Sequence, residues 1–474
     1  MFALPGHKTL RATCSLRSGA PKFGHDRGGD MARIIDWRSE YKLKLQSADN
    51  AVSRLQDGQR LIFPTMAGQP HALIAAMGRR LRDGKLARVR TGTILPVPDL
   101  AEALLQPEHS DQIEWDSLFC GNSDRPGIFE GRYDMTPMHF GQMPKIMRDD
   151  MQVGAVMTLV SPPDADSYMS IGISIDYTKS LIESASFSAV EVNPNVPRVF
   201  GDCQVHVTEV DAIVESDNEI FELPNPPGTP EDEKIGAFIA ERIPDGATIQ
   251  LGYGAAPSAV GLCLLDHKHL GIHTEMFVDP MRVLMETGVA DNSRKSVNAG
   301  KTLYTFAAGT RQTYDFLHEN PAIEGHPVEH TNDTSFIAQH KGMVAINATI
   351  AVDLTGQACS ESIGGMQYSG TGGQADFVRG AMLAEGGRSF IATHATAKGG
   401  ALSCIVGGLA PGSVVTTVRA DMDMVVTEFG VAELRGKSLR ERAQALIAIA
   451  HPKFRDGLQE EAATRGLSPK RAGS

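Results

Sequence analysis

The sequence has no long apolar runs and few cysteines. A membrane-spanning helix needs about 20 consecutive apolar residues, and the longest candidates, such as Ala445–Ala450, are far shorter. The chain is therefore not predicted to span a membrane. Its six cysteines form no C-x-x-C pair and no close Cys/His cluster, which favours reduced, mostly buried thiols over a disulfide scaffold. These cysteines are Cys14, Cys120, Cys203, Cys263, Cys359 and Cys404.

Positive charge is also in short supply. The chain has 45 Lys and Arg residues against 57 Asp and Glu residues, a formal net charge of -12. This balance disfavours nonspecific nucleic-acid binding and suits a soluble enzyme. We therefore expect a cytoplasmic location and neither nucleic acid nor membrane as a partner. With 474 residues, 42% of them apolar, the chain should hold two or three domains at about 150 residues each.

Three common catalytic or nucleotide-binding motifs are missing. No G-x-S-x-G elbow occurs, which argues against an α/β-hydrolase serine enzyme. Gly252-Tyr-Gly254 begins like a dinucleotide fingerprint, but Pro257 stands where the third glycine is needed. Gly430–Ser438 has five residues between its glycines where a phosphate loop requires four. A Rossmann or phosphate-loop site is thus not predicted.

Residues 1–30 differ in composition from the rest of the chain. They carry five Lys or Arg residues and no acid before Asp26, with weak apolar periodicity. This composition predicts a disordered leader. Two explanations stay open: a transit peptide, which would imply a mitochondrial location, or a start codon assigned too early, because Met31–Trp37 resembles a natural start of folded sequence.

An internal repeat predicts the fold. Asp57–Leu73 and Asp245–Val260 each show a turn, an apolar strand, a small-residue loop, a proline and a helix. Between these repeats lies the proline-rich segment Leu223–Pro230, which is typical of an exposed linker. We therefore predict an α/β protein with two related open, mainly parallel-sheet domains, at residues 31–224 and 225–474.

Two small-residue loops in the second half are candidate ligand sites. In parallel sheets, ligands gather at the carboxyl ends of strands, where loops lead into helices. Gly252–Pro257 and Ser362–Phe377 fit that description. The second loop has five glycines within the ten residues Gly364–Gly373. They predict either a wide turn or a nest of backbone N–H groups that faces an anion or a developing oxyanion.

An acid follows an apolar stretch at Leu270–Phe277. If this stretch is one strand, Ile272 and Thr274 face one way, while His273 and Glu275 face the other. Alternation alone does not separate a functional Glu275 from a solvated edge residue. No metal is expected, because the nearest ligand spacing, His326 and His330, is interrupted by Pro327.

Several longer motifs carry a family resemblance, which spans about residues 45–456. They are Glu130–Pro137, Ser161–Asp164, Gly172–Lys179, Gly271–Phe277, Val352–Gln357, Glu361–Gly365, Tyr368–Gln374, Asp376–Gly380 and Val425–Gly436. The chain resembles the acetyl-CoA hydrolase/transferase family, which includes 4-hydroxybutyrate CoA-transferase. The resemblance implies two α/β domains of the CoA-transferase fold.

The resemblance also implies roles for individual residues. Glu275, in the His-Thr-Glu-Met motif, would form a glutamyl-CoA thioester. The Asn332 amide and the Gly373 N–H would be its oxyanion donors. The CoA site would be formed by Gly252, Tyr253, Gly254, Ala255, Ala256, Ser369, Gly370, Gly372, Gly373 and Lys398. The segment Gly254–Ser258 departs from the family because it lacks the second glycine pair and the asparagine common in this loop.

These assignments imply a CoA-transferase that moves CoA between an acyl-CoA and a small carboxylic acid, with no cofactor beyond CoA itself, in a homodimer or higher homo-oligomer. One alternative is an acyl-CoA hydrolase that uses the same glutamate. Another, of a different class, is a noncatalytic CoA-binding regulator, which the intact glutamate motif disfavours. The acyl pocket is expected partly at Met66–Pro70 and Met135–Met138, whose apolar or small side chains favour a short, weakly polar acyl chain.

Overall fold

A parallel sheet of seven strands organises the first half of the chain. The computed structural model describes residues 37–468 except 87, 226 and 253, so the predicted leader lies outside the described residues. The strand order is β10-β7-β5-β1-β2-β3-β4, and each neighbouring pair is parallel. The strands are β1 (Arg60–Ile62), β2 (Val89–Gly92), β3 (Ile113–Ser117), β4 (Asp134–Met135), β5 (Ala155–Val160), β7 (Phe187–Val192) and β10 (Ala212–Glu215).

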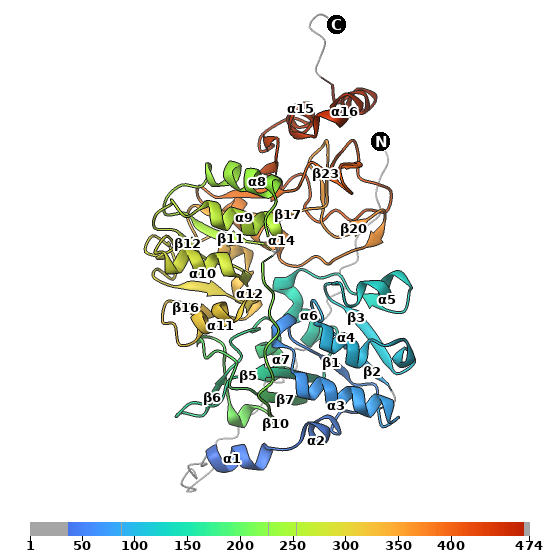
Figure 1. Ribbon diagram of the computed structural model, residues 1–474, viewed down its shortest axis with the longest axis vertical. Helices are drawn as coiled ribbons and strands as arrows, with labels where there is room; N and C mark the ends of the chain where they lie inside the picture. The colour runs from blue at the N-terminus through green and yellow to red at the C-terminus, as the bar shows by residue number, and fades with distance from the viewer. Residues whose placement is uncertain (1–36, 87, 226, 253, 469–474) are drawn as a thin grey trace, which may run out of the picture. The chain divides into compact units, whose positions relative to one another are not determined.

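Helices cover both faces of this sheet (Figure 1). One face packs against α2 (Ala48–Val52), α3 (His71–Arg82) and α4 (Pro98–Leu104). The other packs against α6 (Met143–Asp149) and α7 (Thr178–Ser184). Because both faces are covered, the central strands β5 and β7 are buried at every residue. The polar residues Thr158, Ser188 and Glu191 are buried together with the apolar ones.

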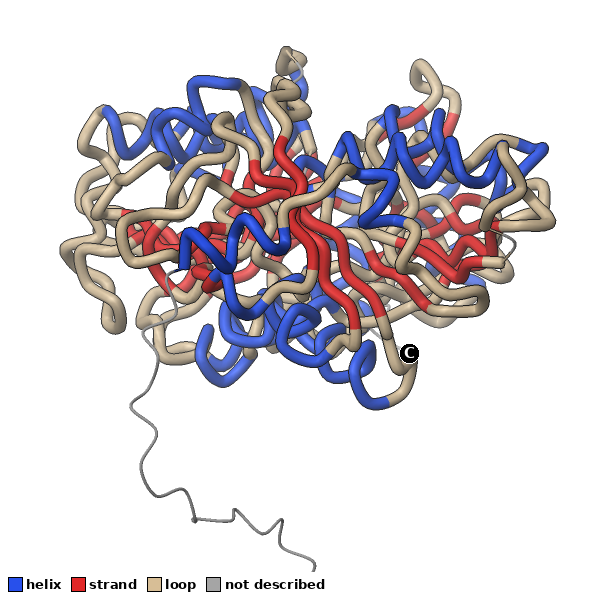
Figure 2. Tube along the Cα trace, turned by 90° about the horizontal axis from the view of Figure 1, so that it is seen from below, coloured by secondary structure: helices blue, strands red, loops and turns tan. Residues whose placement is uncertain are grey.

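The second half contains a six-stranded sheet with the order β12-β11-β17-β22-β26-β27. Its strands are parallel except for β27, which pairs antiparallel with β26. They are β11 (Thr248–Leu251), β12 (Gly271–Ile272), β17 (Met343–Ala348), β22 (Arg388–Ala392), β26 (Met424–Thr427) and β27 (Gly430–Glu433). Figure 2 shows the strands of the molecule lying between layers of helices.

The helices of the second half also lie on two sides of their sheet. On one side are α8 (Pro230–Ala240), α9 (Ala255–Cys263) and α10 (Asp279–Glu286). On the other are α13 (Thr334–Ile337), α14 (Gln374–Leu383), α15 (Leu439–Ile449) and α16 (Pro452–Thr464). The prediction of an α/β protein with mainly parallel sheets is confirmed.

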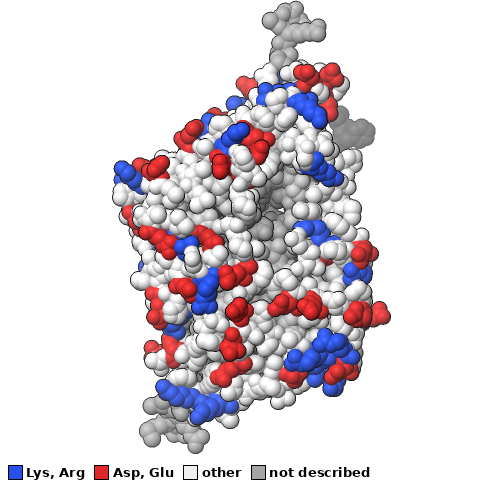
Figure 3. All heavy atoms as spheres, in the orientation of Figure 1, with Lys and Arg blue, Asp and Glu red and all other residues white. Residues whose placement is uncertain are grey.

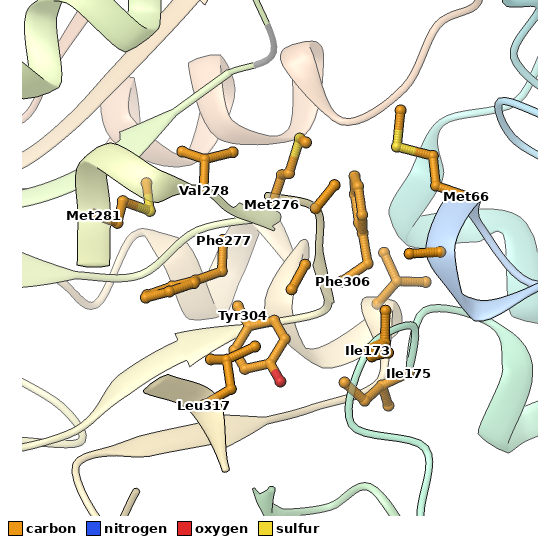
Figure 4. Packing of buried hydrophobic residues seen from close by; sticks show 14 of the residues in the cluster. Met66, Ile173, Ile175, Met276, Phe277, Val278, Met281, Tyr304, Phe306 and Leu317 are labelled. Carbon is orange, nitrogen blue, oxygen red and sulfur yellow. The ribbon is translucent and has the colours of Figure 1, made fainter. Parts of the chain in front are cut away.

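The two halves share one apolar core. A single cluster of buried side chains runs from α6 and α7 of the first half to α8, α9 and α10 of the second. The strand β8 (Phe200–Gly201) adds to the small parallel sheet of β14 (Thr302–Tyr304) and β16 (Ile323–Gly325). Figure 4 shows Ile173 and Ile175 beside Tyr304 in this core. Residues from Trp37 onward cluster as one unit, and the proposed boundary at residue 224 stays a prediction.

The two repeated segments both form a strand followed by a helix. In the first, β1 leads through the short helix η1 (Met66–Gly68) to α3, with Pro70 as the N-cap residue. In the second, β11 leads to α9, which contains Pro257 in its first turn. Among the described residues, no helix is both long and apolar enough to cross a bilayer.

Candidate active site

Glu275 lies at a bend between two short strands. The prediction of one strand over Leu270–Phe277 is wrong, because β12 pairs with β11 of the six-stranded sheet, whereas β13 (Met276–Phe277) pairs with β15 (Phe306–Ala307). The backbone changes sheets between them. Two N–H groups, of Thr305 and Phe306, donate to the Glu275 carbonyl at 3.0 and 3.1 Å. These bonds fix the backbone from which the carboxylate projects.

The carboxylate of Glu275 lies close to Asn332 and Gly373, the two residues predicted to supply oxyanion donors. Nδ2 of Asn332 donates to Oε2 of Glu275 at 2.8 Å. Asn332 follows α12 (Val328–Thr331) and is buried. A Cβ atom on Gly373 would lie 1.7 Å from Oε2 of Glu275 and 2.2 Å from Nδ2 of Asn332. Only glycine can therefore occupy position 373 without displacing the other two side chains.

The environment of Glu275 favours its protonated form. The pKa of Glu275 is raised to about 7, chiefly by burial. The nearby carboxyl group of Asp376 raises this pKa further, whereas the Asn332 hydrogen bond lowers it. A glutamate that titrates near neutral pH at a cavity wall is typical of a functional carboxylate.

The glycines of the loop Gly364–Gly373 fall into two groups, and each group requires glycine for a different structural reason. Gly364 and Gly365 have φ of 60° and 81° and connect the hairpin strands β20 (Ser362–Ile363) and β21 (Met366–Gln367). Such a two-residue turn requires positive φ at both positions. Gly370 packs against Phe119, where an added Cβ would lie 2.7 Å from the Phe119 backbone. The first pair therefore makes a turn, and the later glycines allow close approach at the site.

A cavity of about 570 Å³ borders Glu275. Both halves of the chain line it. Side chains from the first half include Met66, Ile94, Phe119, Arg125 and Phe140, and those from the second include Gln250, Met276, Phe306, Asn347 and Tyr368. In Figure 4, Phe306 stands between Met276 and Met66. Among the described lining residues, Glu275 is the one acid and Arg125 the one Lys or Arg.

Few charged side chains surround the hollow at the centre of the face shown in Figure 3. The acidic and basic side chains on this face are interspersed, and the hollow at its centre has mostly uncharged walls. Arg125 is partly buried, and its guanidinium lies 3.8 Å from the centre of the Tyr368 ring. Its Nε also donates to the Tyr368 carbonyl at 2.6 Å. These contacts hold one cation at the cavity.

The predicted CoA-binding residues fall into two groups. Five of them line the cavity: Gly252, Ser369, Gly370, Gly372 and Gly373. Gly254, Ala255 and Ala256 form the start of α9 but do not line it, and Tyr253 lies outside the described residues. Lys398 is exposed at the tip of the hairpin of β23 (Thr396–Ala397) and β24 (Leu402–Ser403) and does not line the cavity either.

Only part of the sequence expected to form the acyl pocket lines the cavity. Met66 lines it, whereas Ala67–Pro70 and Met135–Met138 do not. Sequence reasoning missed Phe119, Arg125 and Phe140. Phe119 lies in the loop after β3, and Arg125 begins the helix α5 (Arg125–Phe129) that follows this loop, so applying the rule of strand carboxyl ends to the first half would have pointed to both.

His273 supports the site indirectly. Its ring is buried, and its Nε2 lies 2.8 Å from the carbonyl oxygen of Thr331, so Nε2 carries the proton. Burial holds the pKa of His273 well below its usual value. The ring packs against His340 and Phe377. This neutral histidine fixes the residue before Asn332, and its Nδ1 is buried without a hydrogen-bond partner among the described residues.

Two family domains match the chain. Residues 30–223 match the acetyl-CoA hydrolase/transferase N-terminal domain, and residues 309–462 match the acetyl-CoA hydrolase/transferase C-terminal domain. The chain belongs to the acetyl-CoA hydrolase/transferase family. The resemblance inferred from its motifs is thus confirmed, and the protein is an enzyme of this family.

Relatives within the acetyl-CoA hydrolase/transferase family match most of the chain. Succinyl-CoA:cyclohexane-1-carboxylate CoA transferase of Geobacter metallireducens is 43% identical over 426 residues, which cover 90% of this chain and 96% of that protein. 4-hydroxybutyrate coenzyme A transferase of Clostridium kluyveri is 41% identical over 429 residues, covering 90% and 99%. Acetyl-CoA hydrolase of Candida albicans is 30% identical over 261 residues, covering 50% and 46%.

Solved structures show the same fold. RipA from Yersinia pestis superposes with a TM-score of 0.88 at 38% identity, covering 91% of this chain and 100% of that one. 4-hydroxybutyrate CoA-transferase from Porphyromonas gingivalis gives a TM-score of 0.76 at 34% identity, covering 90% and 100%. The predicted CoA-transferase fold is therefore confirmed.

Proposed function

We propose that the protein transfers CoA between an acyl-CoA and a small carboxylic acid, with Glu275 as the nucleophile. The observation that carries this proposal is the position of the Glu275 carboxylate: it lines the cavity, bonds to Asn332 and lies against Gly373. A carboxylate is a weak nucleophile, so attack on a thioester needs donors already aimed at the developing oxyanion. The Asn332 amide and the Gly373 N–H fill that role.

The reaction proceeds in two balanced halves. The Glu275 carboxylate attacks the thioester carbonyl carbon, the C–S bond breaks, and CoA leaves as a thiolate. An acyl-glutamyl anhydride remains. The thiolate then attacks the glutamyl carbonyl, which releases the original acyl group as a free carboxylate and leaves CoA on Glu275 as a thioester. A second carboxylic acid runs these steps in reverse, so one thioester replaces another.

CoA would lie along the glycine loop at Ser369–Gly373 and Gly252, which line the same cavity. Arg125 lines this cavity and would provide a positive charge for an anionic ligand. The acyl group would contact Met276, Phe306 and Phe140, which surround Glu275. Phe306 donates its N–H to the Glu275 carbonyl at 3.1 Å, and the Phe140 and Phe306 rings lie 6.0 Å apart. These walls favour an apolar acyl chain.

Hydrolysis is the second candidate, because water could intercept the same glutamyl thioester. The relatives favour transfer over hydrolysis. The relatives that match about 90% of the chain, at 36–43% identity, include several CoA-transferases, whereas the Candida albicans hydrolase matches half of the chain at 30%, as does one succinyl-CoA:acetate CoA-transferase at 34%. Loss of acyl-CoA should therefore depend on an added carboxylate.

The test follows acyl-CoA consumption with and without acetate. We expect a new acyl-CoA to appear with acetate and little free CoA to accumulate without it. Equal rates of CoA release in both conditions would establish hydrolysis instead. Incubation with acyl-CoA alone should attach CoA to the peptide that contains Glu275, as seen by mass spectrometry. Glu275→Gln should abolish both turnover and this adduct.

A further inference from the structure

A second carboxylate is buried within the same hydrogen-bond network as Glu275. Asp376 lies in the first turn of α14 and is 7% exposed. Nδ2 of Asn332, which donates to Glu275 at 2.8 Å, also lies 3.4 Å from Oδ2 of Asp376. The Asn332 amide group therefore lies between two carboxylates. The reaction steps proposed above use Glu275 and leave Asp376 without a role.

Asp376 also holds a segment of the first half against the site. The Gly141 N–H donates to Oδ2 of Asp376 at 3.1 Å, and Nδ1 of His139 lies 3.9 Å from Oδ1. Next to Gly141, the Phe140 N–H donates to the carbonyl of Gly372 at 3.0 Å. Asp376 thus contacts Asn332 from one half and Gly141 from the other.

Within the part of the chain that the structure describes, the Asn332 side-chain amide makes no other hydrogen bond that fixes its orientation. Its Oδ1 is buried and has no hydrogen-bond partner there. A flipped amide would place this oxygen against the carboxylates, so the two negative charges decide which way the amide points. Of the two, only Glu275 changes charge during the proposed reaction: as a thioester it is neutral.

We propose that Asp376 is a positioning residue that keeps the Asn332 N–H groups aimed at Glu275 after Glu275 has been converted to its CoA thioester. This inference rests on the proposed function. In the resting enzyme, the Glu275 carboxylate itself attracts the amide. In both the anhydride and the thioester, Glu275 carries no charge and Asp376 is the carboxyl group that remains beside the amide, so it matters in each half of the reaction when the glutamyl carbonyl is attacked.

The test compares the two half-reactions in the wild type and in Asp376→Asn, whose shape is conserved but whose uncharged amide accepts either orientation of Asn332. Rapid-quench measurements would follow formation of the glutamyl-CoA thioester from acyl-CoA and its consumption by acetate. We expect consumption to slow on the order of tenfold, the factor implied by loss of one charge-assisted hydrogen bond. Formation should slow by a similar factor, because it crosses the same tetrahedral intermediate in the opposite direction, and the KM for acyl-CoA should stay near the wild-type value.

Two further variants make the result decisive. Asp423→Asn replaces another buried carboxylate, which accepts from the Ser389 N–H outside the cavity, and should leave both half-reactions unchanged. Asp376→Ser removes the charge in a smaller side chain and gives the same readout if Asp376→Asn does not fold. No slowing of either half-reaction, or a loss that appears in the KM for acyl-CoA alone, in a folded variant would overturn the positioning role. Failure of the wild type to form any thioester would instead overturn the proposed function.

Discussion

Gly373 approaches Glu275 so closely that an added Cβ would lie 1.7 Å from Oε2. We therefore expect Gly373→Ala to displace the carboxylate, which is the far end of a flexible side chain, and to break its contact with Asn332. Activity should fall on the order of 100-fold, the loss typical of removing one oxyanion donor. Steady-state kinetics would measure kcat, and circular dichroism would show that the fold persists.

The matched control for this substitution is Gly457→Ala in α16. A Cβ there meets no atom within 4 Å. Because alanine is favoured over glycine inside a helix by about 1 kcal/mol, this variant should be fully active and slightly more stable. If Gly373→Ala is equally active, the close contact at Glu275 has no catalytic role.

The pH dependence should report the ionisation of Glu275. Its pKa is raised to about 7, and the ionised form is the nucleophile. As the pH falls through 7, the ionised fraction decreases, so kcat/KM should drop about tenfold per pH unit below that value. A kcat/KM profile that stays flat down to pH 5 would contradict Glu275 as the titrating nucleophile.

Asn332→Ala should move this acid limb to higher pH. The Asn332 hydrogen bond lowers the pKa of Glu275, so its removal raises that pKa. The maximal rate should also fall by about 10²–10³, as for other oxyanion donors. Both changes can be read from one set of kcat/KM profiles. A lower rate with an unshifted limb would mean that Asn332 contacts Glu275 only after the reaction has begun.

Glu275→Gln should stabilise the protein at neutral and higher pH. Ionised Glu275 opposes folding above the pKa of the unfolded state because its folded pKa is raised from 4.5 to about 7. At pH 8 the uncharged glutamine should therefore increase the free energy of unfolding by up to about 3 kcal/mol. The difference should shrink as the pH falls and disappear below about 4.5. Thermal unfolding of both proteins across this pH range would measure it.

Arg125 and Lys398 are two candidates for the residue that binds the negatively charged groups of CoA. Arg125 lines the cavity, whereas Lys398 lies outside the lining. Arg125→Gln should therefore raise the KM for acyl-CoA about tenfold and leave kcat nearly unchanged, and Lys398→Gln should have little effect. The reverse pattern would show that the hairpin of β23 and β24 carries the CoA contact suggested by the family resemblance.

Several features could be predicted from the sequence because they are local. The strand and helix signals of the two repeats predict the α/β class, and the motif around Glu275 identifies the residue that we propose as the nucleophile. The glycines at 370 and 373 signal close backbone approach, which the structure shows at Phe119 and Glu275. Each of these inferences needs only residues near one another in the chain.

Other features depend on distant segments that meet only in the fold. The bend at Glu275 follows from hydrogen bonds to Thr305 and Phe306, which alternation within Leu270–Phe277 does not encode. Arg125 reaches the cavity from the first half and is held there by Tyr368 from the second. Asp376 likewise meets Gly141 across a separation of 235 residues. Reading each half by itself could not reveal these contacts.

The scarcity of cations around the cavity has a consequence for the speed of substrate capture. Acyl-CoA is an anion, and the chain carries a net charge of -12, so at long range the two repel each other. The single arginine among the described residues that line the cavity offsets little of this repulsion. Encounter should therefore become faster as added salt screens the repulsion, so that this enzyme gains association rate at ionic strengths where an electrostatically steered enzyme loses it.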